Sequence, residues 1–131
     1  MKEKAIKYFK EGFSCSESII KAASEEDLCP KELLPIATAF SGGMSSGCLC
    51  GTLAAAQLIN GYYFGQNNSK GNEVTARQNA SYLVEEFKKR NKVTCCRVLS
   101  AGLQGMARKE NCSKYVADVC ELLEGIMQVH A

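Results

Sequence analysis

Four of the eight cysteines in this sequence of 131 residues stand where helices are expected to begin. They are Cys15, Cys50, Cys96 and Cys112. The first turn of a helix leaves backbone N–H groups unpaired and carries the positive end of the helix dipole, and both features stabilise a thiolate. The thiolate is the form of cysteine that acts as a nucleophile or binds a metal. Four such positions therefore indicate one shared redox or metal centre.

The spacing of these four cysteines narrows the type of centre. No two of them form the C-x2-C pair that is typical of zinc ribbons and common ferredoxins. The four thiols would come from separate helices and meet only when the chain folds. N–H···S hydrogen bonds at helix starts would offset part of the negative charge of an iron–sulfur or zinc centre. An iron–sulfur cluster is favoured, because a zinc ribbon and a thioredoxin-type dithiol would each show a C-x2-C pair. Zinc, or no cofactor and a reversible disulfide instead, are the alternatives.

The other four cysteines carry less information. Cys48 stands two residues before Cys50, and Cys95 directly precedes Cys96. Either could replace a ligand or act as a resolving thiol. Cys29 precedes Pro30 in a turn expected at the surface, and Cys120 lies on the apolar stripe of the last helix. Both are expected to be structural, because a free cysteine often packs as a small apolar side chain.

Several classes of site are disfavoured by what the sequence lacks. The only histidine, His130, stands next to the end of the sequence, which disfavours a Cys-His nucleophilic pair and a histidine-rich zinc site. The glycine run at residues 42–47 has neither the G-K-[ST] of a phosphate loop nor a strand-framed G-x-G-x-x-G. A C-x-x-C beside a βαβ pattern, which is typical of thioredoxin-like enzymes, is absent as well.

Charge and hydropathy indicate where the protein acts. The net charge is +2, from 16 basic and 14 acidic residues, and the longest basic run is residues 88–90. Nucleic acid and anionic membranes are therefore not expected as partners. The first residues lack the apolar stretch of a signal peptide or a membrane span. We expect a cytoplasmic protein, whose thiols stay reduced and free for metal binding or redox chemistry.

Apolar residues recur at spacings of three and four, and there are only two prolines. This pattern predicts an all-α protein, and the length predicts a single domain over residues 1–131, a compact helical bundle of five to seven helices. A first helix at residues 2–10 should end near Gly12. Ser14 and Glu17 form a capping box for the second helix, which places Cys15 at its first position.

Further helices follow from the same reasoning. Pro30 is suited to open a third helix that runs to residue 40. A glycine-rich loop then leads through Cys50 into residues 52–64, which are apolar on nearly every face and should form the buried centre of the domain. Residues 76–87 carry one apolar stripe.

The C-terminal third is expected to hold two more helix starts. Thr94 can cap a short helix that carries Cys95 and Cys96. The last helix has an apolar stripe over residues 116–127, and Cys112 is expected at its entrance, beside the potential caps Asn111 and Ser113.

Four short stretches that contain the cysteines of the set occur in an order that is found in a known protein family. They are Gly-Phe-Ser-Cys at residues 12–15, the glycine-rich run into Cys50-Gly51, Cys-Arg-Val-Leu at 96–99 and Cys-Ser-Lys-Tyr-Val at 112–116. Together they resemble the C_GCAxxG_C_C family of redox-active proteins, named after its cysteine pattern, over nearly the whole length. After Cys50-Gly51 this family usually has Ala-x-x-Gly, whereas this sequence has Thr52 and Ala55.

The resemblance implies a redox or metal site of four cysteines, and a similar domain occurs attached to a multihaem cytochrome for which an iron–sulfur centre has been proposed. We therefore expect a protein that binds an iron–sulfur cluster or another metal through the four cysteines and transfers electrons to a redox partner protein, with a homodimer also possible. Two other functions stay open. One is a thiol-disulfide oxidoreductase that uses the same cysteines, and the other is a structural or sensory metal-binding module.

Overall fold

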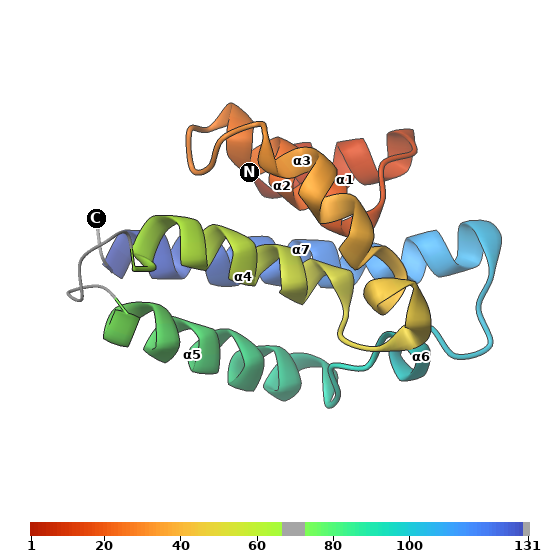
Figure 1. The fold of residues 1–131 in the computed structure, drawn as a ribbon. Helices are drawn as coiled ribbons and strands as arrows, with labels where there is room; N and C mark the ends of the chain where they lie inside the picture. Colours follow the sequence, from red (N-terminus) through yellow and green to blue (C-terminus); the bar gives the residue numbers. More distant parts are fainter. Residues whose placement is uncertain (67–72, 130–131) are drawn as a thin grey trace.

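The computed structural model describes residues 1–66 and 73–129, and these residues form seven α-helices and no β-strand (Figure 1). The predicted all-α bundle of five to seven helices is confirmed, while His130 lies outside the described residues. The helices are α1 (Lys2–Glu11), α2 (Cys15–Glu25), α3 (Leu33–Ala37), α4 (Gly51–Phe64), α5 (Glu73–Asn91), α6 (Cys96–Leu99) and α7 (Gly105–Val129), with a 3-10 turn η1 (Thr38–Phe40) and a π-type turn η2 (Gly43–Gly47) between α3 and α4.

The junction between α1 and α2 is built as the sequence predicts. Gly12 ends α1 in the left-handed conformation, with φ of 119°, a conformation that glycine adopts without a steric penalty. The hydroxyl of Ser14 accepts the N–H of Glu17, and the Glu17 carboxylate accepts the N–H of Ser14 at 3.0 Å. This capping box makes Cys15 the first residue of α2.

The third helix begins later than Pro30 predicts. Pro30 lies in a turn, in which its carbonyl accepts the N–H of Leu33 at 3.1 Å, and α3 begins at Leu33. Pro35 falls in the first turn of α3, where its missing N–H costs no intrahelical hydrogen bond. The segment does reach Phe40, but as α3 followed by η1.

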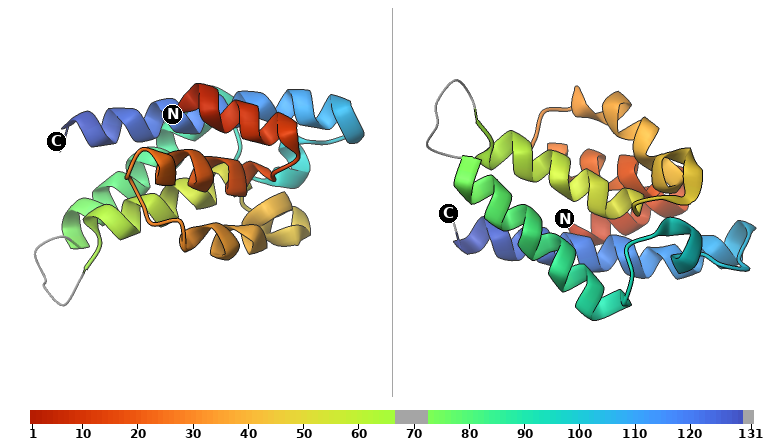
Figure 2. Two further views of the ribbon diagram at one scale, coloured as in Figure 1. Left: turned by 90° about the horizontal axis from the view of Figure 1, so that it is seen from above. Right: turned by 60° about the horizontal axis from the view of Figure 1, so that its bottom comes forward.

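The apolar helix α4 is the centre of the bundle, as predicted. It packs against α2, α5 and α7, and the views of Figures 1 and 2 agree that α4 and α5 run side by side in opposite directions. Leu53, Ala55 and Ile59 are fully buried. Two side-chain amides join α4 to α5, since Gln57 donates to the Ala80 carbonyl and Asn60 to the Ala76 carbonyl.

The last helix begins earlier than predicted. α7 starts at Gly105, so Cys112 is its eighth residue and does not stand at its entrance. Asn111 does not cap this helix, because its amide donates to the Leu99 carbonyl at 2.9 Å and so joins α7 to α6. Residues 106–110 are mostly good helix formers, which extends the helix toward its N-terminus.

The short helix α6 also differs in detail from its prediction. Cys95 occupies the N-cap position in place of Thr94, so the helix does not include Cys95 and begins at Cys96. The Cys95 side chain makes no capping hydrogen bond. The start of α6 is held instead by backbone contacts with the segment before α4, which are described below.

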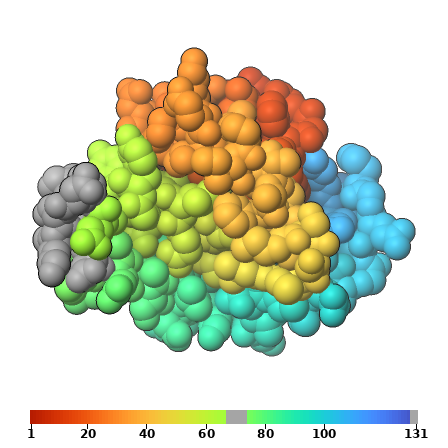
Figure 3. Space-filling model, viewed as in Figure 1, coloured from red at the N-terminus to blue at the C-terminus, as the bar shows by residue number. Residues whose placement is uncertain are grey.

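The starts of α4 and α6, the turn η2 and the first turns of α7 lie at one end of the bundle (Figures 1 and 3). α2 begins at the same end, because α1 crosses the bundle and α2 returns (Figure 2). Across residues 1–66 and 73–129, no helix combines the length and the apolar character that crossing a bilayer would require.

We expect Leu53→Ala to lower the free energy of unfolding by about 2 to 5 kcal/mol, because it leaves a cavity where α4 meets its neighbours. Val74→Ala is the matched control, since the Val74 side chain is exposed and its loss should change stability by less than about 0.5 kcal/mol. Urea denaturation followed by circular dichroism measures both values. Equal effects of the two substitutions would contradict the central position of α4.

Candidate functional site

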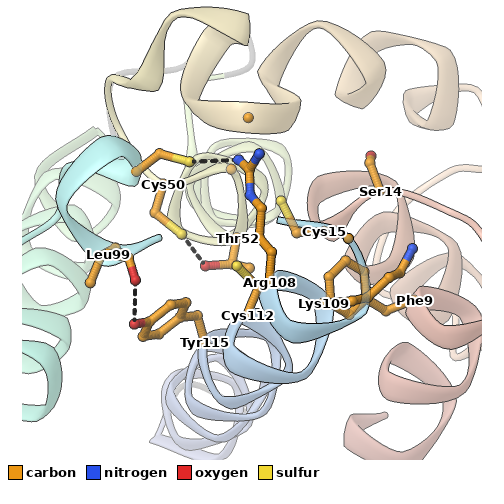
Figure 4. Close-up of a pocket in the computed structure, with 14 residues that line it drawn as sticks. Phe9, Ser14, Cys15, Cys50, Thr52, Leu99, Arg108, Lys109, Cys112 and Tyr115 are labelled. Carbon is orange, nitrogen blue, oxygen red and sulfur yellow. Dashed lines mark hydrogen bonds between the residues drawn. The ribbon is translucent and has the colours of Figure 1, made fainter. Parts of the chain in front are cut away.

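One cavity of about 200 Å³ at the common end of the helices is lined by all four cysteines of the set. Figure 4 shows Cys15, Cys50 and Cys112 around the side chain of Arg108. The walls that solvent can reach are almost entirely apolar. The remaining lining residues are Phe9, Ser14, Gly42, Gly51, Thr52, Cys96, Leu99, Gly105, Lys109 and Tyr115.

Cys15 faces the cavity from the first position of α2. Its sulfur receives hydrogen bonds from the backbone N–H groups of Ser16 and Gly42. The start of α4 lies directly against it, because a Cβ on Gly51 would come within 2.8 Å of both the Cys15 sulfur and the Phe40 carbonyl oxygen. Glycine at position 51 therefore permits the close approach of α2, η1 and α4 at the cavity.

Cys50 is the N-cap residue of α4 and is buried. Its sulfur receives hydrogen bonds from the backbone N–H groups of Thr52 and Leu53 and lies 3.0 Å from the Thr52 hydroxyl oxygen. These contacts come from the first turn of α4, where N–H groups have no partner within the helix. The N–H···S contacts expected at helix starts are thus present at Cys15 and Cys50.

Cys96 is held beside Cys50 by a short antiparallel pairing of two loops. The N–H of Cys50 donates to the Thr94 carbonyl at 2.8 Å, and the N–H of Cys96 donates to the Cys48 carbonyl at 2.6 Å. Gly43 packs against this pairing, since a Cβ there would lie within 2.7 Å of the Cys48 backbone and the Cys96 Cβ. The glycine run at 42–47 therefore positions the cysteines by close packing.

Cys112 reaches the cavity from the third turn of α7, not from a helix start. Arg108, one turn earlier on the same helix face, hydrogen-bonds the Cys112 sulfur and lies 3.6 Å from the Cys96 sulfur through Nη2. The guanidinium of Arg108 thus contacts thiols from two different helices. Its place, four residues before Cys112 on a helix, is the sequence signal that could have predicted it.

The two cysteines considered as substitute ligands do not line the cavity. Cys48 is exposed, and the Cys95 thiol donates to the Gly47 carbonyl at 3.0 Å. Cys29 and Cys120 are buried away from it, in the hydrophobic core. The expected surface position of Cys29 is therefore wrong for its side chain, because the thiol packs into the core. Four cysteines therefore face the cavity and four do not.

The four thiols are not drawn together as a ready-made metal cage. Within the described residues, no three cysteine, histidine or acidic side chains lie close enough to one another to hold a metal ion. All four thiols nevertheless line the same cavity, and Arg108 contacts the sulfurs of both Cys96 and Cys112.

Comparison with known proteins gives one match. The family model described as "Putative redox-active protein (C_GCAxxG_C_C)" matches residues 13–126. The chain belongs to this family. The resemblance seen in the sequence is confirmed, and with it the general assignment as a redox-active protein. Neither the curated proteins nor the solved structures contain a match to the chain.

Burial is the largest influence on the pKa values of Cys15, Cys50 and Cys112 in this member of the redox-active family. It raises the pKa of the Cys15 thiol to about 12, and repulsion from Cys50 adds to this, while the N–H groups of Gly42 and Ser16 act in the opposite direction. Burial also raises the pKa values of Cys50 and Cys112, although Thr52 and Arg108 respectively oppose the shift. The N–H groups at helix starts do lower the pKa values of Cys15 and Cys50, as expected, but desolvation raises them by more. The expectation of a net stabilised thiolate at these positions is therefore wrong.

Other cavity residues were not foreseen from the sequence. Lys109 lies 4.5 Å from the centre of the Phe9 ring and donates to the Phe13 carbonyl, which closes the cavity on the side of α1. Tyr115 donates through its hydroxyl to the Leu99 carbonyl at 3.2 Å and so fixes α6 against α7. Both depend on contacts between helices far apart in the sequence, which local patterns do not report.

We expect iodoacetamide to label Cys15 of the reduced, metal-free protein very slowly at pH 8. A pKa of about 12 leaves about one thiol in ten thousand ionised at that pH, and the labelling rate should rise about tenfold per pH unit up to pH 11. Mass spectrometry of the labelled peptides measures the rate, with exposed Cys48 as the internal comparison. Equal rates at Cys15 and Cys48 at pH 8 would contradict the raised pKa, and equal rates in urea are the control.

Proposed function

We propose that the protein is an electron carrier in which Cys15, Cys50, Cys96 and Cys112 together bind an iron–sulfur cluster. The observation that carries the proposal is the meeting of four thiols, from four separate segments, on one cavity with apolar walls. When bound, the cluster would supply reversible one-electron chemistry. The electrons would pass to a redox partner protein.

The chemistry of the cavity suits a thiolate-bound centre. Iron–sulfur clusters and zinc prefer thiolate ligands, and four thiols face this cavity. The backbone N–H groups that reach Cys15 and Cys50 would offset the negative charge of bound thiolates. The four sulfurs must move closer together than they lie in this structure for all of them to bind one group.

Binding of a cation would couple to proton release at this site. Burial keeps Cys15, Cys50 and Cys112 in the protonated form near neutral pH. Each thiol that becomes a ligand must lose its proton, so binding should weaken as the pH falls. The guanidinium of Arg108 hydrogen-bonds the Cys112 sulfur and would favour its thiolate.

A thiol-disulfide oxidoreductase is the second candidate. Within the described residues no three ligand side chains lie close enough to hold a metal, and a disulfide needs only two of the four thiols to meet. In that function one thiolate attacks the disulfide of a partner, forms a mixed disulfide and releases one partner thiol. A second cysteine of the chain then attacks the mixed disulfide and releases the other partner thiol. The chain gains a disulfide, and the partner gains two electrons and two protons.

The two candidates differ in what a single Cys→Ser substitution does. We expect each of C15S, C50S, C96S and C112S to abolish or strongly reduce iron and sulfide binding after anaerobic reconstitution, because serine replaces a soft thiolate poorly. Iron and sulfide analysis and the visible spectrum measure this. Cys48→Ser is the matched control and should bind as the unchanged protein does, since Cys48 is exposed and outside the cavity.

Two results would reject the cluster. One is retention of iron by all four variants, and the other is a colourless reconstituted protein with no bound metal. Mixed disulfides trapped by C15S or C112S, with no metal in any form of the protein, would support the oxidoreductase instead. Bound zinc without iron or colour would keep the four ligands but exclude electron transfer through them.

The remaining alternative, a module whose metal creates the fold, is tested by removing the metal. The core formed by α1, α2, α4, α5 and α7 extends well beyond the cavity, so the chelated and reduced protein should stay helical and unfold cooperatively. Metal should add about 3 to 4 kcal/mol at concentrations of 100 to 1,000 times its Kd. Circular dichroism measures both, and a random-coil spectrum that metal restores would favour the structural module.

A further inference from the structure

A second, more open hollow lies beside the cysteine cavity. This groove has a volume of about 620 Å³ and is lined by nine residues, of which Gly42, Cys96 and Arg108 also line the cavity. The groove therefore leads from the surface directly to Cys96. Its other lining residues are Ser45, Gly47, Arg97, Ser100, Ala101 and Gly102.

The groove is positively charged. Two of its lining residues are arginines and none is acidic. Arg97 donates to the Ser46 carbonyl at 3.0 Å, and Arg108 lies 3.6 Å from the Cys96 sulfur. In the ranges 1–66 and 73–129, neither guanidinium forms an ion pair with a carboxylate.

These two arginines differ from Arg90 elsewhere on the surface. The guanidinium of Arg90 pairs with Asp118 at 3.2 Å and with Glu121 at 2.7 Å. The protein as a whole is nearly neutral, with a net charge of +2. Two guanidiniums without carboxylate partners on one groove are thus a local excess of positive charge, which attracts an anionic group.

Apolar side chains stand on the same three elements that build the groove. Met44 lies on η2, Val98 on α6 and Met106 on the first turn of α7, and their exposed fractions are 39%, 57% and 76%. Figure 3 shows the segments of η2, α6 and the start of α7 gathered at one end of the molecule. Exposed apolar side chains beside charged ones are typical of surfaces that bind another protein.

We propose that this end of the molecule, with Arg97 and Arg108 in the groove and Met44, Val98 and Met106 around it, docks an acidic face of the redox partner protein. The proposal rests on the proposed redox function, because a partner bound there would lie next to Cys96. Its carboxylates would pair with the two guanidiniums, and its apolar side chains would cover the methionines and Val98. A free small anion would use the charges but leave these apolar side chains exposed to water.

The location suits either form of redox chemistry at the cavity. Arg97 and Arg108 would steer an acidic partner toward the groove and raise its association rate at low salt. Methionine side chains adapt to different partner surfaces, which suits a short-lived complex. Because Cys96 lines both hollows, the docked partner would be close to the redox centre without displacing a core helix.

The test uses a labelled peptide that represents the acidic partner face. The peptide contains glutamate, glycine and leucine, and its binding to the reduced, metal-free full chain is followed by fluorescence anisotropy. We expect binding that weakens as salt rises from about 0.01 M to about 0.15 M, which shortens the Debye length from ~30 to ~8 Å. The double variant R97E/R108E should weaken binding about tenfold or more.

Three controls separate groove binding from other causes. Lys4→Glu, at an exposed position of α1, changes the net charge by as much as each of the two arginine substitutions does. It should leave binding within about twofold. A peptide with lysine in place of glutamate should not bind, and one with serine in place of leucine should bind more weakly. Should R97E/R108E lose its helical circular dichroism spectrum, R97Q and R108Q replace it, each expected to weaken binding about threefold.

Several results would overturn the proposal. One is that the acidic peptide does not bind at low salt, and another is that Lys4→Glu weakens binding as much as R97E/R108E does. A third is that the serine peptide binds as tightly as the leucine peptide and inorganic phosphate displaces both, which would indicate a small-anion site. The assay contains no metal, so failure to reconstitute a cluster does not affect it. Failure of docking leaves the metal-binding results of the cysteine variants equally unaffected.

Discussion

The site depends on the antiparallel pairing of two short loops, residues 48–50 and 94–96. The hydrogen bonds from Cys50 to Thr94 and from Cys96 to Cys48 fix the start of α4 against the start of α6. The helix α6 has only four residues, too few to be stable by itself, so it depends on these hydrogen bonds. The pairing requires backbone groups to approach closely, which explains why Gly43 packs against it where no Cβ fits. Two cysteines from distant parts of the sequence thereby face one cavity.

Helix starts and burial act on the same thiols in opposite directions. The N–H groups at the starts of α2 and α4 favour the thiolates of Cys15 and Cys50, while removal from water favours the neutral thiols and is the larger effect. The N–H groups are nevertheless in place before any ligand binds. They would favour a centre whose positive metal ions replace the protons, because the desolvation penalty falls when the thiolate charge is neutralised. A site of this kind would therefore favour a thiolate that is bound to a metal ion over a thiolate that is free.

Local patterns in the sequence were sufficient for most helices but not for the assembly of the site. The capping box at Ser14 and the apolar segment of α4 correctly predicted Cys15 at a helix start and the centre of the bundle. Cys112 was placed wrongly, because Asn111 reads as a cap but bonds across to Leu99. The position of Arg108 one turn before Cys112 was a usable signal, but its contact with Cys96 joins two helices and could not be predicted locally. Contacts between distant segments leave no periodic signal, so the shared cavity follows only from the fold.

The turn before Cys48, which helps to build the site, has a strained backbone. Residues 42–45 all have positive φ, and two of them, Met44 with φ of 63° and Ser45 with φ of 55°, are not glycine. Left-handed conformations cost such residues about 1 to 2 kcal/mol each. The same turn brings the Gly42 N–H to the Cys15 sulfur and exposes Met44 beside the groove. A bundle core centred on α4 supplies the stability that offsets this strain, so the site can be strained without being essential to folding.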